Sequence, residues 1–217
     1  MPNTVAPRPL VTLVVIAKEP RAGYSKTRLN PPLSLAQAAE LAAACIDDTI
    51  AAIAHVRVDR RILYYQGTEV PESAGDMQIL PQSPGGLDER LASLFDHCTG
   101  PTLLIGMDTP QLTAALLEPA CESWPDNVDA WLGPAHDGGF WAIGMREPRG
   151  DLIRGIAMST DQTGALQLAR LREAGLRVGL LDPLTDVDTY ADAVAVASDA
   201  PHTRFAKLFA TMHILGR

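Results

Sequence analysis

The sequence predicts an α/β fold built from successive β-α units in a single domain. Residues 10–17, LVTLVVIA, form a continuous apolar run rich in β-branched residues, which is typical of a strand buried on both faces. Similar short runs alternate along the chain with segments that follow the 3.6-residue period of a helix. The chain has 217 residues, of which 47% are hydrophobic, and this is enough to bury a substantial core.

The first half of the chain keeps this alternation throughout. Ser34 and Gln37 form the pattern of a capping box, which predicts a helix start, and apolar residues then recur with the helical period as far as Ile53. The elements expected after this helix are strands at 60–66 and 77–80, a helix at 86–98 and a strand at 101–108.

The second half departs from the alternation once. Thr113 is expected to cap a helix that runs to about Trp124. DAWLGP and GFWAIGM lie on either side of the loop AHDG and resemble a pair of strands more than a crossover. We then expect a helix near 163–174, a strand at 177–181, the segment DPLTDVDTY and two further helical stretches.

Composition limits the partners and the location that can be expected. The formal charge of -8 argues against nucleic acid and anionic membranes, because affinity for both is driven by surplus Lys and Arg. No apolar run approaches the ~20 residues of a membrane span, and residues 1–9 lack the apolar core of a signal peptide. We therefore expect a cytoplasmic protein with a disordered segment at 1–9 and one domain at 10–217. Cys45, Cys98 and Cys121 lack a C-x-x-C pair and are expected to be reduced, mostly buried thiols.

The loop after the first strand, AKEPRAGYSKTRL at 17–29, looks at first like a phosphate-binding P-loop. That pattern requires glycine immediately before its lysine and again six residues before it. Counted from Lys26, these positions hold Ser25 and Pro20, so the P-loop reading fails. The loop nevertheless gathers four basic side chains around Gly23: Lys18, Arg21, Lys26 and Arg28. It therefore suits an anion by another architecture.

Carboxylates follow three of the other predicted strands. Asp108 ends LLIGMD, Asp137 follows WLGP, and Asp186 and Asp188 follow GLL. In sheets built from β-α units, ligands bind at the carboxyl ends of the strands. Hard divalent cations prefer carboxylate oxygens and share phosphate ligands, so the basic loop and these carboxylates together suit a phosphate chain bridged by a metal.

Four blocks of the sequence together resemble the signature of a known family. They are AKEPRAGYSKTRL, GMDTPQL, GPAHDGGFWAIGM and LDPLTDVDTYADA, within about residues 10–197. They resemble the GT-A-fold glycosyltransferase-like family of radical-SAM/selenodomain-associated transferases, which is distantly similar to the molybdenum-cofactor and phospholactate guanylyltransferases. The resemblance implies the GT-A (nucleotide-diphospho-sugar transferase) fold, a three-layer α/β/α arrangement with a mostly parallel central sheet. Met158 departs from the family, which usually has an aromatic residue there.

The resemblance assigns nucleotide and metal roles to the first, second and fourth blocks. It makes Lys26 and Arg28 contacts of the nucleotide phosphates, with Arg21 a weaker candidate, and it makes Asp108 and Asp188 ligands of Mg²⁺ or Mn²⁺. Each role has a structural alternative. The basic loop could be a solvated surface, Asp108 could form an Asx-turn before a proline, and Asp186 or Asp188 could cap the helix that follows. Which of those two aspartates would be the second metal ligand stays open.

The remaining candidates concern the base and the acceptor. Asp137, Gly138 and Gly139 fall where the family meets its second substrate, although D-G is also favoured in a tight turn. Ser159 and Thr160 could bind substrate or cap the following helix. Gln82, Gly85 and Gly86 fall where related enzymes contact the base or the ribose, although the segment QSPGG is also typical of an ordinary turn.

The resemblance implies a transferase with Lys26, Asp108 and Asp137 as its catalytic residues. No hydrolytic nucleophile motif occurs in the sequence, so a covalent enzyme intermediate is not expected. Nucleotidyl transfer from an NTP to a small phosphorylated or acidic acceptor is preferred. Glycosyl transfer from a nucleotide-diphospho-sugar and a non-catalytic nucleotide-binding module are the alternatives. The expected partners are a nucleotide, a small acceptor and, for a homodimer, a second copy of the chain.

Overall fold

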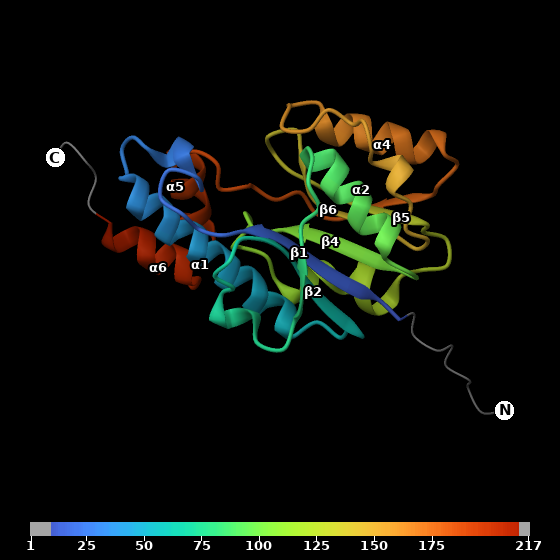
Figure 1. Ribbon diagram of the computed structural model, residues 1–217, viewed down its shortest axis with the longest axis horizontal. Helices are drawn as coiled ribbons and strands as arrows, with labels where there is room; N and C mark the ends of the chain where they lie inside the picture. Colours follow the sequence, from blue (N-terminus) through green and yellow to red (C-terminus); the bar gives the residue numbers. More distant parts are fainter. Residues whose placement is uncertain (1–9, 213–217) are drawn as a thin grey trace.

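The computed structural model describes residues 10–212, so the predicted disordered segment 1–9 lies outside the described residues. Seven strands of this part of the chain form one sheet in the order β3-β2-β1-β4-β6-β5-β7 (Figure 1). The strands are β1 Thr12–Lys18, β2 Arg60–Gln66, β3 Gln78–Pro81, β4 Thr102–Gly106, β5 Ala130–Pro134, β6 Phe140–Met145 and β7 Val178–Leu180. Only β6 runs antiparallel to its neighbours. The predicted mostly parallel sheet is confirmed.

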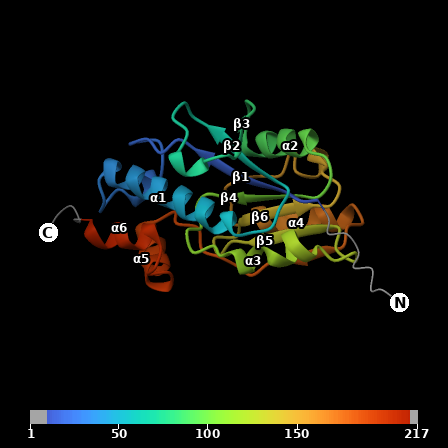
Figure 2. The same cartoon turned by 90° about the horizontal axis from the view of Figure 1, so that it is seen from below.

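Helices cover both faces of this sheet. They are α1 Leu35–Ala54, α2 Leu87–His97, α3 Ala114–Glu118, α4 Thr163–Glu173, α5 Tyr190–Asp199 and α6 Arg204–Thr211. Leu13 and Val15 of β1 share a buried cluster with residues of α1 and α3, whereas Val14 shares another with residues of α2 and α4. Consecutive residues of β1 thus meet opposite layers, which explains its continuous apolar run. The predicted three-layer α/β/α arrangement is confirmed, and Figure 2 shows α1 and α3 together on one side of the sheet.

A third cluster extends the fold beyond the sheet. Residues of α1 pack there against α5 and α6, which lie beside α1 at one end of the molecule (Figures 1 and 2). Asp48 of α1 accepts hydrogen bonds from the backbone N–H groups of Arg204 and Phe205 at 2.9 and 2.8 Å. These bonds satisfy two amides at the start of α6 and fix that helix on α1.

The predicted start of α1 is confirmed in detail. The N–H of Gln37 donates to Ser34 Oγ at 3.2 Å, and the N–H of Ser34 donates to Gln37 Oε1 at 2.8 Å. The predicted strand pair also holds, because β5 and β6 are antiparallel neighbours on either side of the AHDG loop. Cys45 and Cys121 are buried and Cys98 is half-buried, and all three are free thiols.

The helix expected from Thr113 to Trp124 is wrong in part. The α-helix begins at Ala114 but stops at Glu118, and a π-helical turn, Pro119–Ser123, follows it. Pro119 has no N–H to donate to the preceding turn, so the regular hydrogen-bond ladder cannot continue through it. Thr113 stands at the first position, but its side chain makes no capping hydrogen bond within the described residues.

Candidate functional site

A cleft of about 640 Å³ opens at the carboxyl ends of the strands. Its lining includes Lys18 at the end of β1, Gln66 at the end of β2 and Asp108 just after β4. Asp186 and Asp188, which follow β7, also line it. This edge of the sheet is the one at which an α/β fold binds its ligands.

Lys26 lies directly beside the cleft and contacts two of its carboxylates. Lys26 Nζ is 2.7 Å from Asp108 Oδ1 and 3.2 Å from Asp188 Oδ1, and the Lys26 side chain is only 6% exposed. The guanidinium of Arg28, 69% exposed, forms a second ion pair with the other oxygen of Asp188. The four residues that the sequence predicted to converge therefore meet at one place.

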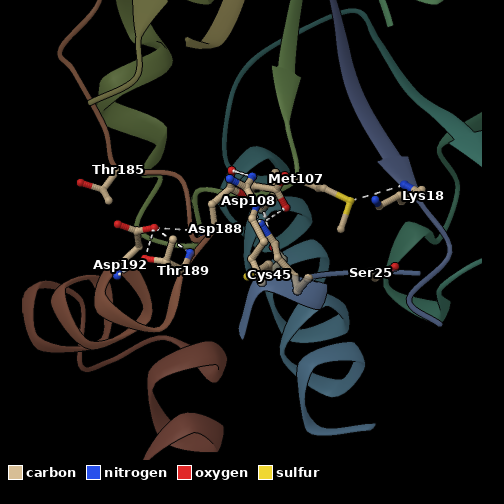
Figure 3. A network of polar contacts seen from close by, with 12 residues as sticks. Lys18, Ser25, Cys45, Met107, Asp108, Thr185, Asp188, Thr189 and Asp192 are labelled. Atoms are coloured by element: carbon tan, nitrogen blue, oxygen red, sulfur yellow. Dashed lines mark hydrogen bonds and ion pairs between the residues drawn. The ribbon is translucent and has the colours of Figure 1, made fainter. Parts of the chain in front are cut away.

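Each carboxylate of this group comes from a different part of the chain. The backbone N–H of Val187 donates to the carbonyl oxygen of Asp108 at 2.9 Å, which ties the segment after β7 to the end of β4. Figure 3 shows Asp108 and Asp188 side by side near Cys45 of α1. The site is thus built by a backbone link between two loops, not by one motif.

The electrostatics of the group follow from burial and charge. Burial alone would lower the pKa of Lys26, but the carboxylate of Asp108, assisted by Asp188, outweighs it and raises the pKa, so the amine stays protonated. Burial raises the pKa of Asp186 to about 7, and the nearby charge of Asp108 adds to this rise. Asp186 is therefore partly protonated near neutral pH.

The alternative that Asp186 or Asp188 caps the next helix is wrong. Thr189 caps α5 itself, because its hydroxyl accepts the N–H of Asp192 at 3.3 Å and Asp192 Oδ2 accepts the N–H of Thr189 at 2.7 Å. This local capping box leaves the Asp188 side chain for Lys26 and Arg28. Of the two aspartates in DVD, Asp188 makes the ion pairs.

The donor set fits a divalent cation that brings ligands of its own. Asp108 Oδ1 is buried and its contact with Lys26 is an ion pair without hydrogen-bond geometry. Two carboxylates thus converge on a single position that now holds one positive charge. Among residues 10–212, no group of three or more His, Cys, Asp or Glu could hold a metal. Mg²⁺ commonly takes one or two carboxylates and completes its shell with water and substrate phosphates, and this pair suits that mode.

The Asp137 hairpin is both a tight turn and part of the cleft. Asp137 Oδ1 accepts the N–H of Gly139 at 2.8 Å, and Gly138 has a φ of +90°, as the turn reading predicted. Asp137 and Gly139 also line the cleft, whereas Gly138 faces the backbone of Asp161 behind it. The N–H of Gly164 donates to the carbonyl of Gly138 at 2.8 Å, so the hairpin is locked to the start of α4.

Ser159 and Thr160 both line the cleft. Ser159 has a left-handed backbone with φ 59°, and Met158 lines the cleft beside it. The Thr160 hydroxyl accepts the N–H of Gln162 at 3.3 Å, but Gln162 and not Thr160 stands at the N-cap of α4, so the alternative that Ser159 or Thr160 caps this helix is wrong.

The residues expected to meet base or ribose divide into two groups. Gln82 lines the cleft, and its amide donates to the carbonyls of Ala17 and Tyr64 at 2.9 and 3.0 Å, bridging the ends of β1 and β2. Gly85 and Gly86 are exposed and do not line the cleft, because they form the turn into α2.

Arg21 also lies outside the cleft lining. Its guanidinium stands 5.2 Å from the ring centroid of Tyr24 within the same loop. Of the four basic residues in the loop, Lys18 and Arg28 line the cleft and Lys26 contacts its carboxylates, so Arg21 alone is placed apart from them.

Sequence reasoning missed two charged residues of the cleft. Arg90 of α2 lines it and donates to Gln66 Oε1 at 2.9 Å and to Gln82 Oε1 at 3.3 Å. Asp161 lines the opposite half, with Asp137. Their positions in the sequence could have indicated them, because Arg90 follows the turn with Gly85 and Gly86, and Asp161 directly follows Ser159 and Thr160. Cations of the cleft thus follow β1 and β3, and its carboxylates follow β4, β5 and β7 or precede α4.

Solved structures share this fold at low sequence identity. A Desulfovibrio desulfuricans G20 protein assigned as a nucleotide-diphospho-sugar transferase has a TM-score of 0.82 at 24% identity, over 92% of this chain and 94% of that one. The 4-diphosphocytidyl-2C-methyl-D-erythritol synthase of Anaerococcus prevotii DSM 20548 has a TM-score of 0.58 at 8% identity, over 88% and 96%. Glucosyl-3-phosphoglycerate synthase of Mycobacterium tuberculosis, in complex with Mn²⁺, UDP and glucosyl-3-phosphoglycerate, has a TM-score of 0.52 at 12% identity, over 90% and 80%. These likenesses confirm the GT-A fold.

The family of the chain follows from sequence similarity. No curated protein matches the chain. A family model matches residues 39–160, more than half of the chain and including the segments that carry Asp108 and Asp137. The chain therefore belongs to the family described as "Uncharacterized protein conserved in bacteria (DUF2064)".

Proposed function

We propose that this protein is a divalent-metal-dependent transferase that moves a nucleotidyl group from an NTP to a small phosphorylated or acidic acceptor, with Mg²⁺ or Mn²⁺ as cofactor. The observation that carries the proposal is the meeting of Lys26 and Arg28 with Asp108 and Asp188 at the edge of the cleft. A cationic pair beside two carboxylates is the arrangement that a metal-bound phosphate chain needs.

The basic loop supplies the contacts for the departing phosphates. An acceptor oxygen attacks the α-phosphorus, the bond to the bridging oxygen breaks, and pyrophosphate leaves with the electron pair. Lys26 offers a buried ammonium and Arg28 a planar guanidinium at the cleft mouth, and both stabilise the charge that grows on pyrophosphate. A metal bound at Asp108 and Asp188 would supply further neutralisation of the phosphates.

The other half of the cleft would hold the acceptor. Asp137 is exposed there and can accept a hydrogen bond from an acceptor hydroxyl, while Ser159 and Thr160 add hydroxyls of their own. Gln82 and Arg90, on the opposite half, are placed to contact the base or ribose. An anionic group on the acceptor would have to lie toward Arg28, away from Asp137.

Glycosyl transfer from a nucleotide-diphospho-sugar is the second candidate, and the charge of the acceptor half favours it. Asp137, Asp161 and Asp186 line this half, and carboxylates there suit neutral sugar-like hydroxyls better than a phosphorylated acceptor. In that reaction the nucleoside diphosphate leaves from the anomeric carbon. The same basic loop would receive the leaving group.

A product assay separates the two reactions. The unaltered protein is incubated with each of four NTPs, Mn²⁺ and pooled phosphorylated acids and sugars, and pyrophosphate is measured. Release of pyrophosphate supports nucleotidyl transfer. Its absence, together with nucleoside diphosphate release from a nucleotide sugar, overturns that proposal in favour of glycosyl transfer.

The variant Lys26→Gln/Arg28→Gln tests the role of the loop. Because its charges act on the developing leaving group, turnover should fall by more than nucleotide affinity does. Arg204→Gln/Lys207→Gln, a double charge removal on α6, is the matched control and should keep the turnover of the unaltered protein.

Several narrower expectations remain proposals. Nucleotide binding with Mn²⁺ but without either product, across the whole panel, would favour a non-catalytic binding module. Four other expectations also stay predictions: the resemblance to the radical-SAM/selenodomain-associated transferases, a single domain over 10–217, a homodimer and a cytoplasmic location. Within residues 10–212, none of the helices combines the length and apolarity that a membrane span needs.

A further inference from the structure

The two carboxylates that suit a metal already share a positive charge from the chain itself. Lys26 Nζ lies within 3.2 Å of one oxygen of Asp108 and one of Asp188, and the lysine side chain is almost fully buried. An ammonium and a divalent cation cannot occupy the same position between these oxygens. Lys26 and a metal must therefore compete for it.

We propose that Lys26 is a tethered cation that holds the position between Asp108 and Asp188 until a divalent cation and a nucleotide phosphate arrive together. This inference rests on the proposed function, because it assigns the nucleotide a part in opening the metal site. Without Lys26, the two carboxylates would repel each other in a half-buried place.

Metal alone meets two obstacles in this arrangement. It finds two carboxylates and no third acidic, His or Cys ligand within the described residues. It must also displace an ammonium that the chain holds at high local concentration, and the displaced ammonium would be left buried without a counter-charge. Binding of the metal by itself is therefore weak.

A nucleotide phosphate removes both obstacles at once. Its oxygens complete the metal shell, and they also accept hydrogen bonds from the released Lys26 ammonium. Metal and nucleotide consequently strengthen each other's binding, and by thermodynamic linkage the effect is the same in both directions.

The loop holds Lys26 ready for this exchange. Lys26 has a left-handed backbone with φ 53°, which is uncommon for a residue other than glycine. Just before it, the fully buried Ser25 accepts the N–H of Arg21 at 3.3 Å and donates to the carbonyl of Glu19 at 3.0 Å. These contacts anchor the backbone, so the exchange needs only a movement of the long side chain.

Mn²⁺ binding without nucleotide tests the proposal directly. Free Mn²⁺ is measured by its electron paramagnetic resonance signal in titrations of the unaltered protein and of Lys26→Met, which keeps an apolar chain of similar length. Lys26→Met should bind Mn²⁺ at least tenfold more tightly. Lys207→Met, which removes an exposed lysine of α6 outside the cleft lining, should match the unaltered protein. Equal or weaker binding by Lys26→Met overturns the proposal.

Two further variants establish where the Mn²⁺ binds and which charge opposes it. Asp108→Asn added to Lys26→Met should abolish the gain, and a persisting gain would place Mn²⁺ elsewhere and overturn the proposal. If Lys26→Met does not fold, Lys26→Gln removes the same ammonium and keeps a polar side chain; it should also tighten Mn²⁺ binding, and an unchanged affinity overturns the proposal. Failure of the proposed function would appear differently, as a lack of nucleotide binding with or without Mn²⁺.

Discussion

Replacement of Gly138 by alanine tests how the acceptor-side hairpin is held. A Cβ at Gly138 would lie 2.0 Å from the carbonyl oxygen of Asp161 and 2.6 Å from its carbonyl carbon. The residue also has a φ of +90°, which side chains rarely adopt. Gly138→Ala therefore carries two costs, a left-handed backbone of about 1–2 kcal/mol and an overpacking term of about 1–3 kcal/mol.

Gly155 provides a control that separates these two costs. It has a φ of +80°, but no heavy atom lies within 4 Å of the position of its Cβ. Gly155→Ala should therefore lower the free energy of unfolding by only about 1–2 kcal/mol. Gly138→Ala should lower it by about 2–5 kcal/mol, so the difference of about 1–3 kcal/mol measures the contact with Asp161.

Equilibrium unfolding in urea, followed by circular dichroism, measures both variants against the unaltered protein. The contact cannot relax cheaply, because the N–H of Gly164 holds the carbonyl of Gly138 at 2.8 Å. Equal losses for Gly138→Ala and Gly155→Ala would refute the packing argument. That outcome would leave the left-handed backbone as the structural reason for glycine at this position.

The remaining predictions concern the carboxylates of the cleft. Asp108→Asn keeps the shape of the side chain but removes its charge, so nucleotide affinity in Mn²⁺ should fall at least tenfold, about 1.4 kcal/mol, while the protein stays folded. Thermal shift with and without Mn²⁺ checks this, and unchanged Mn²⁺-dependent binding would contradict it. Asp186 has a pKa raised to about 7 in the folded protein, against about 4 in the unfolded chain. Its contribution to the free energy of unfolding is therefore complete below about pH 4, where the carboxyl is protonated in both states. That contribution is lost as the pH rises through 7. Asp186→Asn should thus gain stability relative to the unaltered protein between pH 4 and pH 8, by up to about 4 kcal/mol. Urea unfolding in the presence of EDTA at pH 4 and pH 8 measures the difference in free energy of unfolding between the variant and the unaltered protein. The same difference at both pH values would exclude the raised pKa of Asp186.

Local sequence signals predicted most of the elements. The β-branched run of β1, the capping box at Ser34 and the hairpin around AHDG all appear where they were expected. Each signal lies within a few residues and depends on interactions inside one element or between two adjacent ones. The predicted helix from Thr113 is wrong in part because Pro119, which has no N–H, interrupts its regular hydrogen-bond ladder.

The candidate site was predicted as a set of residues but not as a set of contacts. Lys26, Arg28, Asp108 and Asp188 follow predicted strands, the family resemblance assigned them to the phosphates and the metal, and the structure brings them together. Position after a strand was not sufficient, however, since Arg21 comes from the same loop and lies apart from the cleft lining.

The sequence by itself determined the elements, their order and the edge of the sheet that carries the charged loops, because periodicity, caps and turns act over short distances along the chain. Only the tertiary structure decided that Lys26 reaches Asp108 and Asp188, and that Thr189 rather than either aspartate of DVD caps α5. Residues so far apart in the chain meet through the order of strands in the sheet and the backbone link between Val187 and Asp108. Those contacts depend on how separate elements pack, and no local window of sequence encodes them.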